Sequence, residues 1–86
     1  MVSGSSASPF DGALHRLSSL RSGARGVVVR IAGKDASRAD RLSALGVTPG
    51  ATIRVLQRFP AIVFLCDQTE LAVEPAVAHA ILVRTA

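Results

Sequence analysis

Residues 39–54, with the sequence ADRLSALGVTPGATIR, predict a short helix that ends abruptly and continues through a tight turn into a strand. Ala39, Leu42 and Leu45 are three residues apart, so a helix would carry them in a single apolar stripe. The arginines of this segment and of the residues just before it lie off the stripe. We therefore expect the stripe to face the core and the arginines to face water.

Glycine and proline predict how this helix ends and how the strand begins. Gly46 follows the last apolar residue, where a left-handed C-cap is accessible mainly to glycine. Val47 would then pack back onto Leu42, as in a Schellman motif. Pro49 and Gly50 suit the second and third positions of a type II turn, because proline fixes φ and glycine supplies a positive φ. The motif that we expect to define the fold is Leu42, Leu45, Gly46, Pro49 and Gly50.

The composition is that of one small soluble domain. The chain has 86 residues, of which 49% are hydrophobic, and this is enough for a core. Its one cysteine, Cys66, cannot form an internal disulfide. No apolar run approaches the ~20 residues of a membrane helix, and no basic segment precedes an apolar signal stretch. We expect a cytoplasmic protein with a flexible tail over residues 1–13 and one domain over residues 14–86.

Short β-branched and apolar runs predict a mainly-β fold. Capping-box spacing from Ser37 to Asp40 opens the first helix, and Pro75 suits the first position of a second helix over residues 75–80. Five short strands with one or two small helices indicate a barrel that is closed or nearly closed. The expected strands are residues 25–31, 52–58, 61–66, 70–73 and 81–84.

Alternation within the first strand predicts which of its side chains face the core. We expect Val27, Val29 and Ile31 to face inward, with Val28 and Arg30 on the opposite side.

Positive charge gathers in the first half of the chain. The formal net charge is +4, and only Asp35 and Asp40 oppose the basic residues between His15 and Arg58. An anionic partner surface is one interpretation, and a solvated outer face of a small barrel is the other. The basic residues of this half are Arg16, Arg21, Arg25, Arg30, Lys34, Arg38, Arg41, Arg54 and Arg58.

Four segments, in this order, carry a family pattern. They are Leu17 to Val28 (LSSLRSGARGVV), Arg41 to Gly50 (RLSALGVTPG), Thr69 to Val73 (TELAV) and Ala80 to Val83 (AILV). Over about residues 14–83 the chain resembles FeoA, a small cytosolic protein of bacterial ferrous-iron uptake. Its one visible departure is Ser22-Gly23, where the family usually has Pro-Gly in the first turn.

The resemblance implies a fold and a function. The fold would be a small Src-homology-3-like five-stranded barrel with one or two short inserted helices. The same domain is found at the C-terminus of iron-dependent repressors of the diphtheria-toxin-repressor type. The function would be that of a non-enzymatic accessory acting on the cytosolic, GTP-binding part of the FeoB permease. The alternative is a repressor-type interaction domain that contacts nucleic acid or another protein.

The sequence predicts no catalytic centre and no cofactor. No cluster of titratable or nucleophilic groups is evident, and the glycines match no phosphate-binding motif, so we expect no enzyme activity. The metal-ligand types are His15, His79, Cys66, Asp67 and Glu70, which lack the spacing of a metal site, although folding could still gather them. We expect Cys66 to serve as a small apolar side chain in a strand.

Three residues are candidates for contact with a partner. Arg54 and Arg58 would lie on the outer side of the second strand, with Ile53 and Val55 facing inward, and Phe59 follows them. The arginines could meet an acidic partner surface, or they could be a solvated row with Phe59 packing in the hairpin. We disfavour nucleic acid, because the chain has three phenylalanines and no tyrosine or tryptophan to stack bases.

Overall fold

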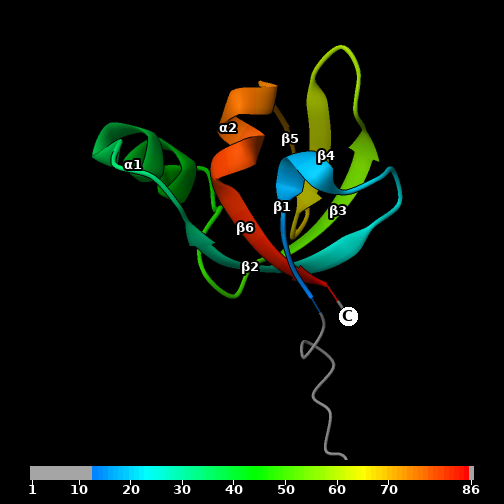
Figure 1. Ribbon diagram of the computed structural model, residues 1–86, viewed down its shortest axis with the longest axis horizontal. Helices are drawn as coiled ribbons and strands as arrows, with labels where there is room; N and C mark the ends of the chain where they lie inside the picture. The colour runs from blue at the N-terminus through cyan, green and yellow to red at the C-terminus, as the bar shows by residue number, and fades with distance from the viewer. Residues whose placement is uncertain (1–12, 86) are drawn as a thin grey trace, which may run out of the picture.

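The computed structural model describes residues 13–85, so all of the predicted tail except residue 13 lies outside the described residues. Six strands, two α-helices and one 3₁₀ helix follow one another along the chain (Figure 1). They are β1 (Leu14–Arg16), η1 (Leu17–Ser19), β2 (Arg25–Ile31), α1 (Ala36–Ala44), β3 (Thr52–Gln57), β4 (Ile62–Cys66), β5 (Thr69–Val73), α2 (Pro75–Ala80) and β6 (Ile81–Thr85).

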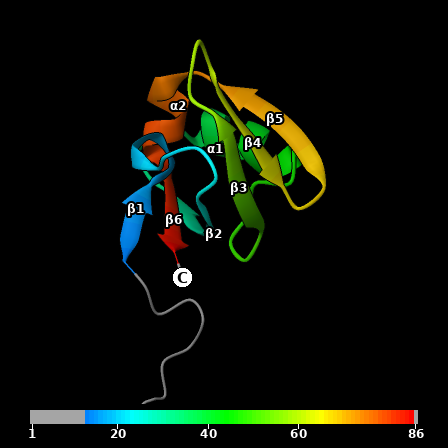
Figure 2. The ribbon, with the colours of Figure 1, turned by 90° about the vertical axis from the view of Figure 1, so that its right-hand side faces the viewer.

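The strands form one antiparallel sheet in the order β1-β6-β2-β3-β4-β5. The sheet curves strongly, and its edge strands β1 and β5 lie on opposite sides of the molecule (Figure 2). The mainly-β architecture with two short helices is therefore confirmed, and the five expected strands are all present. The structure differs in having a sixth strand, β1, and in leaving the barrel open between β1 and β5.

The core fills the concave side of this sheet. Phe64 of β4 and Val55 of β3 are fully buried, as are Ile81 and Val83 of β6. The helix α2 packs against η1, which brings the fully buried Leu17 to one end of the core (Figure 1). Burying a side chain of this size contributes about 1.5–3 kcal/mol, so the apolar inner face of the sheet is the main source of stability.

The prediction of which β2 side chains face the core is wrong for the first part of the strand. Val28 is buried opposite Val83, whereas Val27 is only half-buried. Arg25 and Arg30 are both exposed although they are five positions apart, and a regular strand would direct their side chains to opposite faces. The register shift between Val28 and Arg30 resolves this conflict, because a bulge inserts one residue and restores the outward direction. Ile31, beyond the bulge, packs on the core as expected.

The start of α1 also differs from the expectation. The N-cap is Asp35, whose carboxylate accepts a hydrogen bond from the Arg38 backbone nitrogen at 3.0 Å. Ser37 lies inside the helix, so the predicted capping box is not formed. An aspartate at this position satisfies a backbone donor that has no partner within the helix.

The end of α1 follows the prediction except at Leu45. Gly46 has φ of 97° and donates to Ser43, while the Val47 nitrogen donates to the Leu42 carbonyl at 2.9 Å, which is the Schellman arrangement. Leu42 and Val47 are buried. Leu45, in contrast, is 52% exposed, so the apolar stripe contributes only its middle residue to the core. The prediction that Leu45 faces the core is wrong, because this C-cap residue keeps helical backbone angles and its side chain is more than half exposed at the end of the helix.

Two glycine turns hold β2 and β3 together. Gly50 has φ of 95°, and Ala51 donates to Thr48 as in the predicted type II turn. The turn before β2 is built in the same way, since Gly23 has φ of 89° and Ala24 donates to Arg21 at 3.0 Å. Serine in place of proline at position 22 therefore leaves the shape of the first turn unchanged.

Candidate functional site

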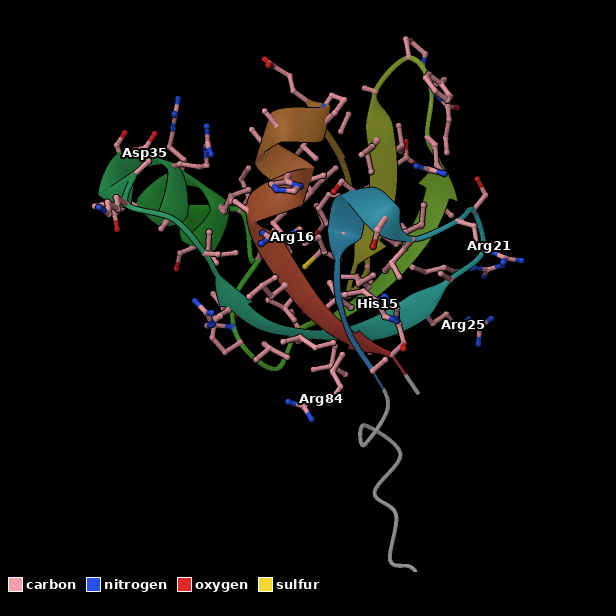
Figure 3. The ribbon with its side chains drawn as sticks, in the orientation of Figure 1. His15, Arg16, Arg21, Arg25, Asp35 and Arg84 are labelled. Atoms are coloured by element: carbon pink, nitrogen blue, oxygen red, sulfur yellow. The ribbon has the colours of Figure 1, made fainter. Side chains whose placement is uncertain are left out.

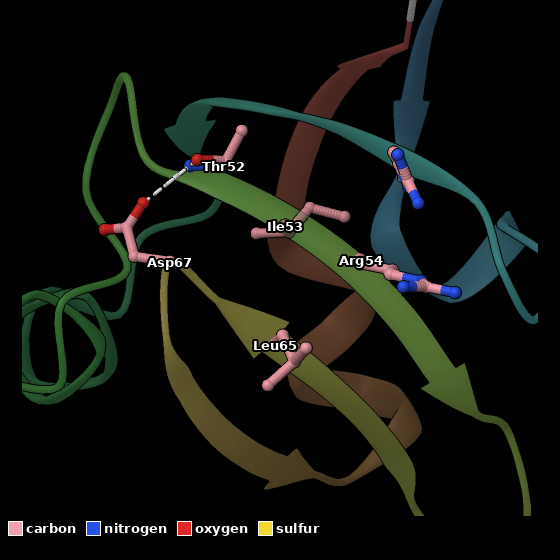
Figure 4. Close-up of a pocket in the computed structure, with 6 residues that line it drawn as sticks. Thr52, Ile53, Arg54, Leu65 and Asp67 are labelled. Atoms are coloured by element: carbon pink, nitrogen blue, oxygen red, sulfur yellow. Dashed lines mark hydrogen bonds between the residues drawn. The ribbon is translucent and has the colours of Figure 1, made fainter.

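The outer face of the central strands carries two arginines in direct opposition. Arg25 of β2 pairs with Arg54 of β3, and both are exposed on the side of the sheet away from the core. Thr52, Ile53 and Leu65 complete an open depression around them (Figure 4). The predicted outward direction of Arg54, with Ile53 and Val55 buried beneath it, is confirmed.

Arg25 is a residue that sequence reasoning did not single out. Arg25 itself could have fixed the phase of β2. A charged side chain at position 25 is expected to face water, and alternation then places Val27 on the same outer face and Val28 on the inner face. The three consecutive valines obscure this phase, because apolar and polar residues do not alternate within them. The expected phase of β2, continued back to position 25, would place Arg25 on the inner face.

The carboxylate of Asp67 lies at the same depression and is already engaged. Its Oδ1 accepts from the Thr52 backbone nitrogen at 3.2 Å and from the Thr52 hydroxyl at 3.0 Å (Figure 4). Asp67 itself adopts a positive φ of 56° in the turn between β4 and β5. These bonds fix the carboxylate at the start of β3, on one side of the depression.

Other arginines are held by backbone oxygens. Arg16 donates to the His79 carbonyl at 2.8 Å, and Arg58 donates to the Ser18 carbonyl at 3.1 Å. Within residues 13–85, the guanidinium groups of Arg25 and Arg54 donate to no other residue. Among the described residues, nothing therefore uses the hydrogen-bonding capacity of this pair.

Arg58 and Phe59 do not join Arg54 on the face of β3. Arg58 follows the end of the strand, and its bond to Ser18 turns it toward η1. Phe59 is 81% exposed in the β3–β4 connection, where Gln57 Nε2 donates to its carbonyl at 2.6 Å. The interpretation of Phe59 as a packing residue of the hairpin is wrong, because the ring projects into solvent. The structure therefore places these three candidates in two separate regions.

The metal-ligand types remain dispersed in the fold. Cys66 is buried, and its thiol donates to the Gly46 carbonyl at 3.3 Å, which confirms its role as a small core side chain. Burial, reinforced by the Asp67 carboxylate, raises the pKa of this thiol above its ordinary value of 9.0. Across residues 13–85, no three histidine, cysteine, aspartate or glutamate side chains gather closely enough to hold a metal ion.

A comparison with protein families identifies the chain. Residues 15–85 match the family model of the FeoA domain. The chain belongs to this family. A solved structure of an iron uptake regulatory protein, FeoA, is similar over 86% of this chain and all of its own, with 32% identity and a TM-score of 0.77.

Two further structures show how widely this fold is used. A manganese-dependent transcriptional repressor is similar at 26% identity and a TM-score of 0.80, over 87% of this chain and 43% of its own. The FeoA of Stenotrophomonas maltophilia, solved with zinc and described as an SH3 domain protein, is 23% identical with a TM-score of 0.69, over 78% of this chain and 86% of its own. The Src-homology-3-like fold is thus confirmed. No match was found among curated protein sequences.

The described FeoA domain contains no membrane-spanning helix. Neither α1 nor α2, the α-helices of residues 13–85, has the length and apolar character needed to cross a bilayer.

Proposed function

We propose that this FeoA-family protein is a non-enzymatic accessory of bacterial ferrous-iron uptake that binds the cytosolic, GTP-binding part of a FeoB-type permease. The observation that carries the proposal is the match of residues 15–85 to the FeoA domain. The S. maltophilia relative is described as a protein that possibly activates ferrous-iron transport, which supports the same role here.

The distribution of polar groups supports binding rather than catalysis. Among residues 13–85 no polar or charged side chain is buried. Catalytic groups are usually tuned by burial or by close charged neighbours, whereas recognition uses exposed aromatic and arginine side chains. Phe59 and the Arg25–Arg54 pair are exposed groups of this second kind.

A direct binding measurement tests the proposal. The purified protein is titrated into the purified cytosolic domain of the FeoB permease from the same cell, with GDP and with a non-hydrolysable GTP analogue, and heat is recorded. We expect saturable binding that Phe59→Ala weakens, because an exposed ring at a hairpin tip is a typical anchor for a partner pocket. Leu45→Ala, which also shortens an exposed apolar side chain, is the matched control. Absence of binding with either nucleotide, to the domain and to the intact permease in detergent, would reject the proposal.

A second candidate function follows from the similarity to the manganese-dependent repressor. In that case the domain would contact a neighbouring protein domain or nucleic acid. Fluorescence anisotropy with duplex DNA at several salt concentrations separates this candidate from the first. For binding to phosphates, the logarithm of the association constant falls linearly with the logarithm of the salt concentration. The slope is proportional to the number of phosphates contacted. A complex centred on an apolar anchor depends less on salt.

A further inference from the structure

We propose that the Arg25–Arg54 pair is a carboxylate-binding site that receives an acidic side chain from an extended segment of the partner protein. The identification of that partner as a FeoB-type permease rests on the function proposed above. The site itself is argued from the geometry of β2 and β3.

The strand register places Arg25 and Arg54 directly opposite each other on one face of the sheet. Hydrogen bonds link Val55 to Ala24 and Val28 to Ala51, on either side of the Arg25–Arg54 pair. Because bonded and non-bonded pairs alternate in an antiparallel ladder, Arg25 and Arg54 occupy a non-hydrogen-bonded position. Side chains approach each other more closely at such positions than at bonded ones.

This closeness is unfavourable for the free protein. Like charges directly opposite each other destabilise a sheet, and neither guanidinium is bonded to another described residue. A single carboxylate between the two would accept hydrogen bonds from both and offset their repulsion. Guanidinium groups bind planar carboxylates through two parallel bonds, and such charge-assisted bonds are about twice as strong as neutral ones.

The surroundings favour a peptide carboxylate over a nucleic acid backbone. Leu65 of β4 pairs with Arg54 of β3, and Glu70 of β5 pairs with Leu65 on its other side. The Asp67 carboxylate stands at the other end of the depression (Figure 4). A polyanion that placed one phosphate on the arginines would bring others toward these two acidic groups. An acidic residue with an apolar neighbour would instead meet the arginines and Leu65.

Positive charge extends from the pair toward the other edge of the sheet. Arg84 of β6 pairs with Val27, which lies next but one to Arg25 on the same face. Figure 3 shows Arg84, Arg25 and Arg21 at the margin of the molecule, away from Asp35. The approach of an acidic segment is thus favoured from this side, because electrostatic complementarity steers association.

Charge-removing variants test the assignment with the FeoB cytosolic domain as the first probe. We expect Arg25→Gln and Arg54→Gln each to weaken binding about tenfold, and the double variant to weaken it further. Arg41→Gln, which removes an exposed arginine from α1, should leave the affinity unchanged. If the wild-type protein binds and both glutamine variants bind equally well, this inference is overturned while the proposed function stands.

Peptide probes decide the question when the wild-type protein does not bind the permease domain. The ¹⁵N-labelled protein is titrated to millimolar concentration with the capped peptide Leu-Glu-Val-Glu-Leu and with its glutamine counterpart, Leu-Gln-Val-Gln-Leu. Shifts of the Arg25, Arg54 and Leu65 amides with the acidic peptide alone support the carboxylate site. No shifts, or equal shifts with both peptides, overturn it. Larger shifts of the same amides with a short DNA duplex also overturn it, in favour of a phosphate-binding surface.

Discussion

Val28 and Val55 occupy equivalent positions opposite the two glycine turns. The Gly50 nitrogen donates to the Val28 carbonyl at 2.8 Å while Val28 donates to Ala51, and the Gly23 nitrogen donates to the Val55 carbonyl at 2.7 Å while Val55 donates to Ala24. Each turn thus ends in a G1 bulge against the strand that the other turn introduces. The pairing of β2 with β3 is therefore fixed at both ends by glycine.

The reciprocal bulges predict equal costs for two substitutions. Gly23→Ala and Gly50→Ala each force a Cβ into a positive φ, although the space around both glycines is open. We expect each to lower the free energy of unfolding by about 1–2 kcal/mol, the usual cost of a left-handed residue. Thermal melts measure the effect, with Ser22→Ala as the control. A full cost at Gly50 without one at Gly23 would show that the first turn is not needed for the register.

Leu42 and Leu45 predict opposite responses to the same substitution. Leu42 is 4% exposed and Leu45 is 52% exposed. Leu42→Ala should cost about 2–5 kcal/mol, because it leaves a cavity in the core, and this approaches the whole stability of a small domain. Leu45→Ala should change the urea midpoint little. A comparable loss from both variants would mean that Leu45 is buried in solution, for instance against a second molecule.

Gly26 is required for close packing of β2 on β6. A Cβ at this position would lie 2.5 Å from Val83 Cγ1 and 2.6 Å from the Arg84 carbonyl oxygen. Gly26→Ala should therefore destabilise the domain by about 1–3 kcal/mol through overpacking. Gly33→Ala is the comparison, since its Cβ meets open space and only its positive φ of 98° is strained. Chemical denaturation of both variants checks the prediction, which fails if Gly26→Ala is as stable as the wild-type protein.

The end of α1 and the turn into β3 were predictable from the sequence, whereas the N-cap of α1 and the phase of β2 were not. Gly46, Pro49 and Gly50 each have a conformational requirement that few other residues meet, so their positions specify the cap and the turn. Each of the three valines of β2 could lie on the inner or the outer face of the sheet. The bulge that decides between the two depends on the pairing of β2 with β6. The strand β1 was missed for a similar reason, since it exists only through its pairing with β6.

Relief of the Arg25–Arg54 repulsion should stabilise the free protein. Replacing Arg54 by threonine, a good strand residue, removes one of two like charges in direct opposition. We expect a gain of about 0.2–1 kcal/mol, which corresponds to a rise in Tm of a few degrees for a domain of this size. Added salt should reduce this difference, because it screens exposed charges. A lower Tm for Arg54→Thr would mean that the arginine is held by an interaction within the free chain.

The buried thiol predicts a loss of stability at alkaline pH. The pKa of Cys66 is raised in the folded protein above its ordinary value of 9.0, so the folded state favours the protonated thiol. Its contribution is fully present below pH 9.0 and is lost as the pH rises through the higher folded-state pKa. Cys66→Ala should remove this part of the alkaline decline, as followed by urea denaturation across the pH range. An identical decline in both proteins would assign it to other groups.

The candidate site was only partly accessible from the sequence. Arg54 could be placed on the outer face because Ile53 and Val55 alternate with it, but its partner Arg25 depends on the register between β2 and β3. Arg58 was expected beside Arg54, yet the strand ends before it and its side chain bonds to Ser18. The register between strands decides which side chains lie opposite each other. In a single sequence, only the residues of tight turns indicate that register.

The pairing of β1 with β6 brings the two ends of the described chain together. Thr85 donates to the Ala13 carbonyl through its backbone nitrogen at 3.1 Å and its hydroxyl at 3.3 Å. A polypeptide can therefore enter and leave this domain at one point without disturbing its core. Such a unit can be inserted into a surface loop of another protein, or be circularly permuted, with little strain.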